Sequence, residues 1–209
     1  MEELFIDTEF AEVYGRAAGK SSAPLILGIH GYSQRNGWHT WEPLMRPLAK
    51  AGFWVVSVDM PGWGRSLPKK PEMMGNGNSV KVIVQILDGL GVDTASNQPV
   101  ALMGKSWGGG IALEVALQYP RRVSQLILTA PARQNFDPLR HLQQPVLLAW
   151  ARDDAVIPYV YAQKYVEAVP TIQLETYATG GHSAAQYNAA DFAVQAVAFL
   201  KKESRRRNI

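Results

Sequence analysis

Residues 100–118 read VALMGKSWGGGIALEVALQ, and this stretch decides the fold. Its four leading apolar residues are typical of a buried strand, and its second half is typical of a helix. Between the two, Ser106 has Gly104 and Gly108 two positions away on either side, the pattern of a sharp turn from a strand into a helix. Glycine is needed there because the turn brings strand and helix so close that a Cβ would clash. Ser106 is therefore a candidate nucleophile at the end of a strand.

The rest of the chain alternates between strand and helix patterns. Apolar runs typical of strands are Leu25–Ile29, Trp54–Val58, Val100–Met103, Gln125–Leu128, Val146–Trp150 and Ile172–Thr176, and a looser alternation over Phe5–Tyr14 predicts one or two leading strands. Helices are predicted over Thr40–Ala51, Ser79–Leu90, Ser106–Tyr119, Pro158–Ala168 and Ala184–Lys202. Nearly continuous apolar strands favour a parallel sheet that is covered on both faces. The predicted fold class is α/β, a three-layer α/β sandwich with a mostly parallel sheet.

Length and composition limit the class of protein. The 209 residues suffice for one domain with a large core, so we expect residues 1–209 to form a single domain. The 47% hydrophobic and 19% charged composition, with no apolar stretch of membrane-spanning length, is typical of a soluble protein. The start Met1-Glu2-Glu3 is unlike a secretory signal, which favours a cytoplasmic location. The absence of cysteine excludes disulfides and a cysteine nucleophile.

The formal net charge of +3 raises the question of a nucleic-acid partner. Much of the excess lies in the tail at 201–209, which we expect to be frayed and solvated rather than a binding arm. We expect no nucleic-acid or membrane partner, and a monomer or weak dimer. The histidines and acids lack metal-ligand spacing, so neither a metal nor another cofactor is expected. The stretch Pro68–Asn78 is the best candidate for a flexible loop.

Five motifs follow one another along the chain. They are Ile29-His30-Gly31, the run Asp59–Ser66 (DMPGWGRS), Gly104–Gly109 (GKSWGG), Trp150–Pro158 (WARDDAVIP) and Gly180-Gly181-His182. Together they resemble the α/β-hydrolase family, from about Leu25 to the C-terminal helix. The resemblance implies the fold predicted above and a catalytic triad in the chain order Ser, Asp, His.

An alcohol is a poor nucleophile at neutral pH, so Ser106 needs a base and the base needs an orienting carboxylate. The resemblance implies His182 as the base, because it comes last in the family order. For the carboxylate it implies Asp154, four residues before Pro158, while the adjacent Asp153 remains an alternative. The other histidines are His30, for which the resemblance implies a mainly structural role, His39 and His141.

The resemblance also implies two backbone donors for an oxyanion. One is the N–H of Trp107, and the other is the N–H of Tyr32 or of Ser33. Several aromatic residues lie near the carboxyl ends of predicted strands, where ligands bind in such sheets. Of these, Trp38, Trp63 and Phe136 are candidates for an apolar acyl pocket, while Trp41 is equally compatible with simple core packing.

Two departures from the family pattern bear on function. Only residues 131–145 separate two predicted strands where many relatives insert a helical lid, which favours a small-ester hydrolase over a lid-activated lipase. Lys105 stands where His, Asn, Tyr or Asp is more frequent. One interpretation is that its cation stabilises negative charge or attracts acidic substrates. The alternative is that the side chain points away from the acyl pocket and pairs with a nearby acid.

The function predicted from these residues is a serine hydrolase that cleaves a small ester-like acyl substrate through Ser106, His182 and Asp154 and an acyl-enzyme. The same residues serve acyl transfer, C–C bond hydrolysis or perhydrolysis equally well. A hydrolase scaffold that only binds a ligand or partner protein is the alternative from a different class.

Overall fold

The computed structural model describes residues 1–69, 78–92 and 99–207. The described strands form a single sheet in the order β1-β2-β4-β3-β5-β6-β7-β8. Their bounds are β1 (Glu2–Asp7), β2 (Glu12–Ala18), β3 (Leu25–Ile29), β4 (Trp54–Val58), β5 (Val100–Lys105), β6 (Val123–Thr129), β7 (Val146–Ala151) and β8 (Ile172–Tyr177). β2 runs antiparallel to both β1 and β4, and the pairs from β4 to β8 are parallel.

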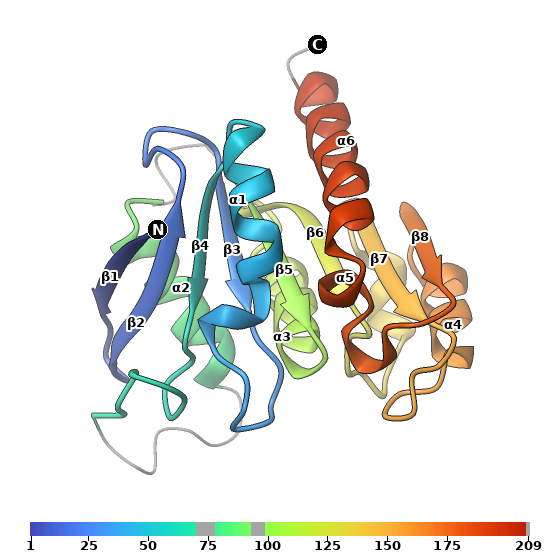
Figure 1. Ribbon diagram of the computed structural model, residues 1–209, viewed down its shortest axis with the longest axis horizontal. Helices are drawn as coiled ribbons and strands as arrows, with labels where there is room; N and C mark the ends of the chain where they lie inside the picture. Colours follow the sequence, from blue (N-terminus) through green and yellow to red (C-terminus); the bar gives the residue numbers. More distant parts are fainter. Residues whose placement is uncertain (70–77, 93–98, 208–209) are drawn as a thin grey trace.

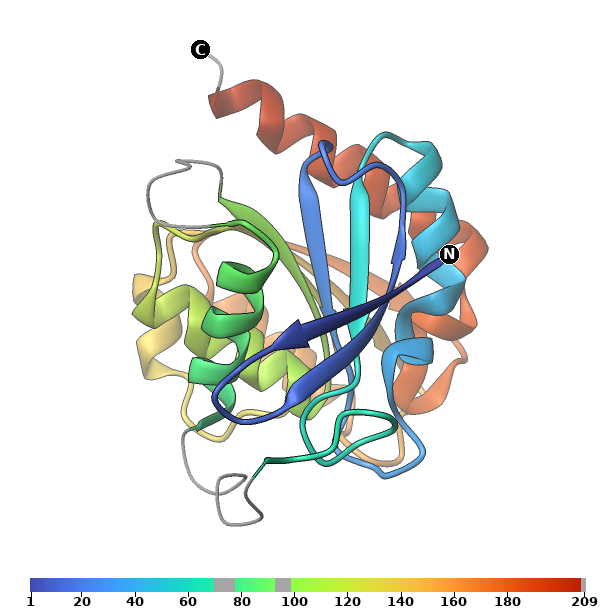
Figure 2. The same cartoon turned by 90° about the vertical axis from the view of Figure 1, so that its left-hand side faces the viewer.

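Helices cover both faces of this sheet. They are η1 (Trp38–Trp41), α1 (Glu42–Lys50), α2 (Asn78–Gly89), α3 (Trp107–Gln118), η3 (Asp137–His141), α4 (Val160–Ala168), η4 (Gly181–Ser183), α5 (Ala184–Tyr187) and α6 (Ala189–Arg207). Figure 1 shows α1, α5 and α6 in front of the sheet, with α2, α3 and α4 behind it. Figure 2 shows the same two helical layers from the side. The predicted three-layer α/β sandwich is therefore confirmed.

The alternation of side chains along the central strands builds two cores. In β3, Leu25, Leu27 and Ile29 join the cluster beneath α2, α3 and α4, whereas Ile26 joins the cluster beneath α1, α5 and α6. Successive side chains of a strand point to opposite faces, so a strand between two helical layers must be apolar at nearly every position. This requirement is the physical reason for the continuous apolar runs in the sequence.

The parallel arrangement places the three candidate site residues at one end of the sheet. Because β3, β5, β6, β7 and β8 are parallel, the segments that follow them emerge at the same edge. Ser106 follows β5, Asp154 follows β7 and His182 follows β8. Residues far apart in the sequence are thus carried to neighbouring positions at the carboxyl edge.

The segment between β6 and β7 confirms the expected absence of a lid. Residues 131–145 contain the short helix η3 and no inserted domain.

The helix predicted over 184–202 is divided at Asn188 into α5 and α6. Most of the predicted flexible loop, residues 70–77, lies outside the described residues, as do residues 208–209. Because α6 is described up to Arg207, fraying of the tail remains a prediction. In the described part of the chain, no helix has the length and apolar character needed to cross a membrane.

Candidate active site

Ser106 occupies a strained turn between β5 and α3. Its φ of 51° and ψ of −117° lie in a region that L residues rarely adopt. Its N–H donates to the carbonyl of Thr129 at 2.9 Å, and its own carbonyl accepts from the N–H groups of Gly110 at 3.1 Å and Ala132 at 2.8 Å. Such backbone strain costs about 1–3 kcal/mol and persists only where the surroundings enforce it. These three hydrogen bonds supply that enforcement.

The glycines of the turn are required by close packing. A Cβ on Gly104 would lie 2.6 Å from both the Gly108 carbonyl oxygen and the Gly109 Cα. A Cβ on Gly108 would collide with the carbonyl oxygens of Ile29 and His30 at the end of β3. The start of α3 therefore rests directly on β3 and β5, which fixes the position of Ser106.

Asp154 and His182 form a hydrogen-bonded pair. The Asp154 side chain is fully buried, and its Oδ2 accepts from His182 Nδ1 at 2.9 Å. Its Oδ1 accepts from the N–H groups of Val156 at 2.9 Å and Ile157 at 3.0 Å. Since an ionised carboxylate only accepts, Nδ1 carries the hydrogen and Nε2 of the neutral ring is the acceptor nitrogen.

The second ring nitrogen of His182 has an unusual environment. Nε2 is buried and has no hydrogen-bond partner among the described residues, so no hydrogen bond joins it to Ser106. Buried polar atoms without partners are rare and occur at catalytic sites. Hydrogen bonds of a catalytic base are often long in ligand-free structures and tighten when substrate binds.

Asp153, the alternative carboxylate, does not contact the imidazole. It is exposed, and it accepts from the N–H groups of Gly181 at 2.8 Å and Gly180 at 3.3 Å. Of the two adjacent acids, Asp154 is the one bonded to His182, and Asp153 braces the turn that carries it.

The two expected oxyanion donors lie beside the turn. Trp107 is the first residue of α3, where backbone N–H groups have no intrahelical acceptor. A Cβ on Gly31 would lie 3.6 Å from Ser106 Cβ, so the segment after β3 passes against the serine. The ring of Tyr32, the next residue, packs edge-on against Trp107 with centroids 5.7 Å apart. The choice between Tyr32 and Ser33 as second donor stays open.

His30 connects the loops behind the serine. The ring is fully buried, its Nδ1 donates to the Gly31 carbonyl at 2.7 Å, and its Nε2 accepts from the Met60 N–H at 2.9 Å. Both nitrogens are thus satisfied in the neutral form. Burial lowers the pKa of His30 below its ordinary value. This environment agrees with the structural role expected for His30.

The lowered pKa of His30 predicts a loss of stability in acid. Below about pH 6.5 the unfolded chain takes up a proton on His30 that the folded protein excludes, so the free energy of unfolding should fall as the pH drops. The contribution from one such group approaches about 1.4 kcal/mol per pH unit at most. Urea unfolding between pH 7.5 and 5 should show a steeper loss for the wild type than for His30→Asn. His141→Asn, at an exposed position, should keep the wild-type slope, and equal slopes in all three proteins would contradict the prediction.

The three aromatic residues predicted for an acyl pocket lie in different places. Trp63 is 7% exposed and stacks on Trp107 with centroids 5.0 Å apart. Trp38 packs on the cluster beneath α1 and α6, with the Arg16 guanidinium over its ring. Phe136 packs against Tyr165 at 4.9 Å between ring centroids. Trp63 thus contacts Trp107, the residue that follows Ser106.

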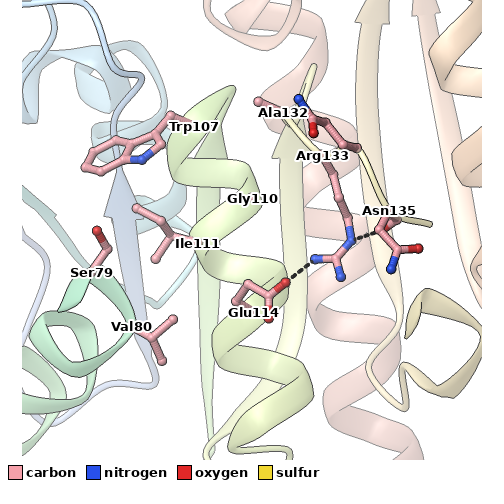
Figure 3. Close-up of a pocket in the computed structure, with 10 residues that line it drawn as sticks. Ser79, Val80, Trp107, Gly110, Ile111, Glu114, Ala132, Arg133 and Asn135 are labelled. Atoms are coloured by element: carbon pink, nitrogen blue, oxygen red, sulfur yellow. Dashed lines mark hydrogen bonds and ion pairs between the residues drawn. The ribbon is translucent and has the colours of Figure 1, made fainter. Parts of the chain in front are cut away.

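A pocket of about 360 Å³ lies on the other side of Trp107. It is bounded by the start of α2, by α3 and by the segment after β6, and Figure 3 shows Trp107 and Ile111 on the side of α3 that faces Ser79 and Val80 of α2. On its polar side, Arg133 pairs with Glu114 at 2.6 Å. Sequence reasoning missed Val80, Ile111 and Arg133. The spacing of Trp107 and Ile111, four residues apart on a helix, was the available signal that they share a face.

No described group of three or more His, Cys, Asp or Glu side chains has an arrangement that could hold a metal ion.

Comparisons with known proteins identify relatives of this chain. The chain is 29% identical over 124 residues to the AB hydrolase superfamily protein YfhM of Bacillus subtilis, a match that covers 59% of this chain and 41% of that protein. It is 32% identical over 123 residues to a 2-hydroxy-6-oxononadienedioate/2-hydroxy-6-oxononatrienedioate hydrolase of Cupriavidus pinatubonensis, covering 58% and 40%. The chain thus spans less than half the length of these curated relatives.

Solved structures match over nearly the whole chain. A protein described as a predicted CIB-like hydrolase from Thermoplasma acidophilum is 28% identical with a TM-score of 0.86, covering 96% of this chain and 98% of that one. The naproxen esterase of Bacillus subtilis, at 16% identity and a TM-score of 0.84 over 95% and 91%, shares the fold. The family model for the alpha/beta hydrolase fold matches residues 24–141, more than half of the chain. The chain therefore belongs to the alpha/beta hydrolase family.

Proposed function

We propose that this protein is a serine hydrolase that cleaves a small ester-like acyl substrate through a covalent acyl-enzyme. The observation that carries the proposal is the hydrogen bond between the buried Asp154 and the partly buried His182. His182 Nε2 has no hydrogen-bond partner among the described residues, and it lies at the edge of the sheet where Ser106 occupies its strained turn. A buried carboxylate, an imidazole in one tautomer and a serine on such a turn are the groups that acyl transfer to serine requires.

In the proposed first half-reaction, Ser106 Oγ attacks the acyl carbon while its proton moves to His182 Nε2. The Asp154 carboxylate stabilises the imidazolium that forms. The N–H of Trp107, together with that of Tyr32 or Ser33, binds the oxyanion, and each such donor is typically worth about 3 kcal/mol of the barrier. The tetrahedral intermediate then expels the alcohol, which takes the proton from His182.

In the second half-reaction, water attacks the acyl-serine while His182 removes its proton. The acid leaves and Ser106 is restored. Both halves use the same base and the same oxyanion donors, so no cofactor enters the scheme.

The pocket beside Trp107 favours a substrate with a small apolar acyl or aryl group. Its volume of about 360 Å³ is near the lower end of ligand pockets, and Val80, Trp107 and Ile111 give it apolar walls. The cation among its described lining residues, Arg133, is paired with Glu114. This pairing favours a neutral ester over a dicarboxylate such as the compounds named for several curated relatives, for which the same triad would hydrolyse a C–C bond. Cytoplasmic location and a monomeric or weakly dimeric state remain predictions from the sequence.

The proposal is tested by reaction with a fluorophosphonate probe. We expect the folded protein to gain the mass of one probe, located on the peptide that contains Ser106, because only an activated serine reacts rapidly with such reagents. Protein denatured before the reaction serves as the control and should not be labelled. An unlabelled folded protein would overturn the proposal and favour a hydrolase scaffold that only binds ligand. If labelling occurs, adding an amine acceptor during turnover of p-nitrophenyl acetate distinguishes hydrolysis from acyl transfer.

A further inference from the structure

A hydrogen bond joins the sequence neighbours of the proposed nucleophile and base. Lys105 ends β5 directly before Ser106, and Ser183 directly follows His182. Lys105 Nζ donates to Ser183 Oγ at 2.7 Å, across 78 residues of sequence. This contact differs from the roles considered for Lys105 from the sequence, because the bonded partner is a hydroxyl group of the histidine turn.

The backbone of that turn has unusual conformational freedom. Gly180 and Gly181 precede His182 with φ values of 134° and 51°, which favour glycine. A Cβ at Gly180 would lie 3.0 Å from Asn188 Nδ2 and 3.1 Å from Ala184 Cα, whereas a Cβ at Gly181 would meet nothing within 4 Å, so the turn is packed at Gly180 and open at Gly181. Beside the direct hydrogen bond of His182 to Asp154, side-chain hydrogen bonds to the residues on either side of His182 help to hold the imidazole.

Two anchors lie on opposite sides of His182 in the sequence. Before it, the Asp153 carboxylate accepts from the N–H groups of Gly180 and Gly181. After it, Ser183 receives the hydrogen bond from Lys105. The first anchor ties the turn to the segment after β7, and the second ties it to β5, the strand that precedes Ser106.

The charge of Lys105 lies within the influence of the catalytic carboxylate. Burial lowers the pKa of Lys105, and the Asp154 carboxylate acts in the opposite direction. The amine is therefore partly withdrawn from water, where a hydrogen bond is less exposed to competition from solvent.

We propose that Lys105 is a positioning residue that acts through Ser183 to hold His182 at the distance from Ser106 that proton transfer needs. This inference rests on the proposed serine-hydrolase function. The wild-type structure has no hydrogen bond between His182 and Ser106, so their approach depends on the segments that carry them. A misplacement of about 1 Å costs on the order of 100-fold in rate when reacting groups must be aligned.

The test is a double-mutant cycle with Lys105→Met and Ser183→Ala. The readouts are the rate of labelling by a fluorophosphonate probe, and kcat and KM for p-nitrophenyl acetate. Methionine keeps an unbranched side chain without the donor, and alanine removes only the hydroxyl. We expect each single variant to lower kcat about 10-fold to 100-fold with KM within about 2-fold, because the defect is in alignment rather than binding. The double variant should be no slower than the slower single variant, since both remove one bond.

Lys105→Arg retains a cationic donor and should restore part of the rate lost in Lys105→Met. A general structural role would not give this selective rescue. Should Lys105→Met fail to fold, Ser183→Ala decides the question alone. Unchanged kcat in Ser183→Ala, or losses that multiply in the double variant, would overturn the inference while the labelled wild type still supported the proposed function. A wild type that is not labelled would overturn the proposed function itself.

Discussion

Ser106→Ala is expected to lower kcat for p-nitrophenyl butyrate by about 10⁶-fold. The variant loses the nucleophile but keeps the oxyanion donors and the pocket, so the activity that remains should be small and not covalent. KM should change little, because the serine side chain forms its bond to the substrate during the reaction rather than on binding.

The measurement is a steady-state assay together with fluorophosphonate labelling. Ser22→Ala is the matched control, because Ser22 is an exposed serine in the turn between β2 and β3, at the opposite end of the sheet. It should retain wild-type rates. Ser106→Ala with more than about a tenth of wild-type kcat would show that another group is the nucleophile.

Asp154→Asn is expected to lower kcat by about 10⁴-fold. The amide no longer stabilises the imidazolium, and its NH₂ group favours the wrong tautomer of His182. Asp153→Asn provides a control one residue away, since its remaining carbonyl oxygen still accepts from the Gly181 N–H. We expect Asp153→Asn to stay within about 10-fold of the wild type.

Comparing kcat of the two variants distinguishes the roles of the two acids, because each substitution removes one negative charge from the same segment. Circular dichroism and thermal unfolding of each variant establish that the compared proteins are folded. A larger loss in Asp153→Asn than in Asp154→Asn would contradict the assignment of Asp154 as the carboxylate that orients His182.

The strands of the sheet could be predicted from the sequence wherever burial is continuous. The bounds predicted for β3 and β4 agree with the structure, because a strand between two helical layers needs apolar side chains on both faces. β2 is different, since it extends beyond the predicted region to Ala18 through antiparallel pairs with β4. Its last residues carry no alternation of their own, and pairing with a neighbouring strand determines their conformation.

The end of the chain shows how a tertiary contact divides a helix that periodicity predicts as continuous. Asn188 lies between α5 and α6, and its Nδ2 donates at 2.9 Å to the carbonyls of Ala184 and Thr179. The first contact is local, but the second is made with the segment after β8. An asparagine side chain competes with helical hydrogen bonds in this way only where such an acceptor is available.

The sequence by itself determined the fold class, the strained turn at Ser106 and the order of the candidate site residues, because these depend on local patterns and short motifs. The resemblance had favoured Asp154 over Asp153, and the tertiary structure shows Asp154 bonded to His182. The tertiary structure alone decided that Lys105 reaches Ser183 and that Val80 and Ile111 face one pocket. Adjacent side chains leave a loop in different directions, and contacts across strands depend on how the segments pack. Sequence spacing does not specify the side-chain directions or these contacts, because both arise only when the carboxyl ends of the parallel strands lie together in the fold.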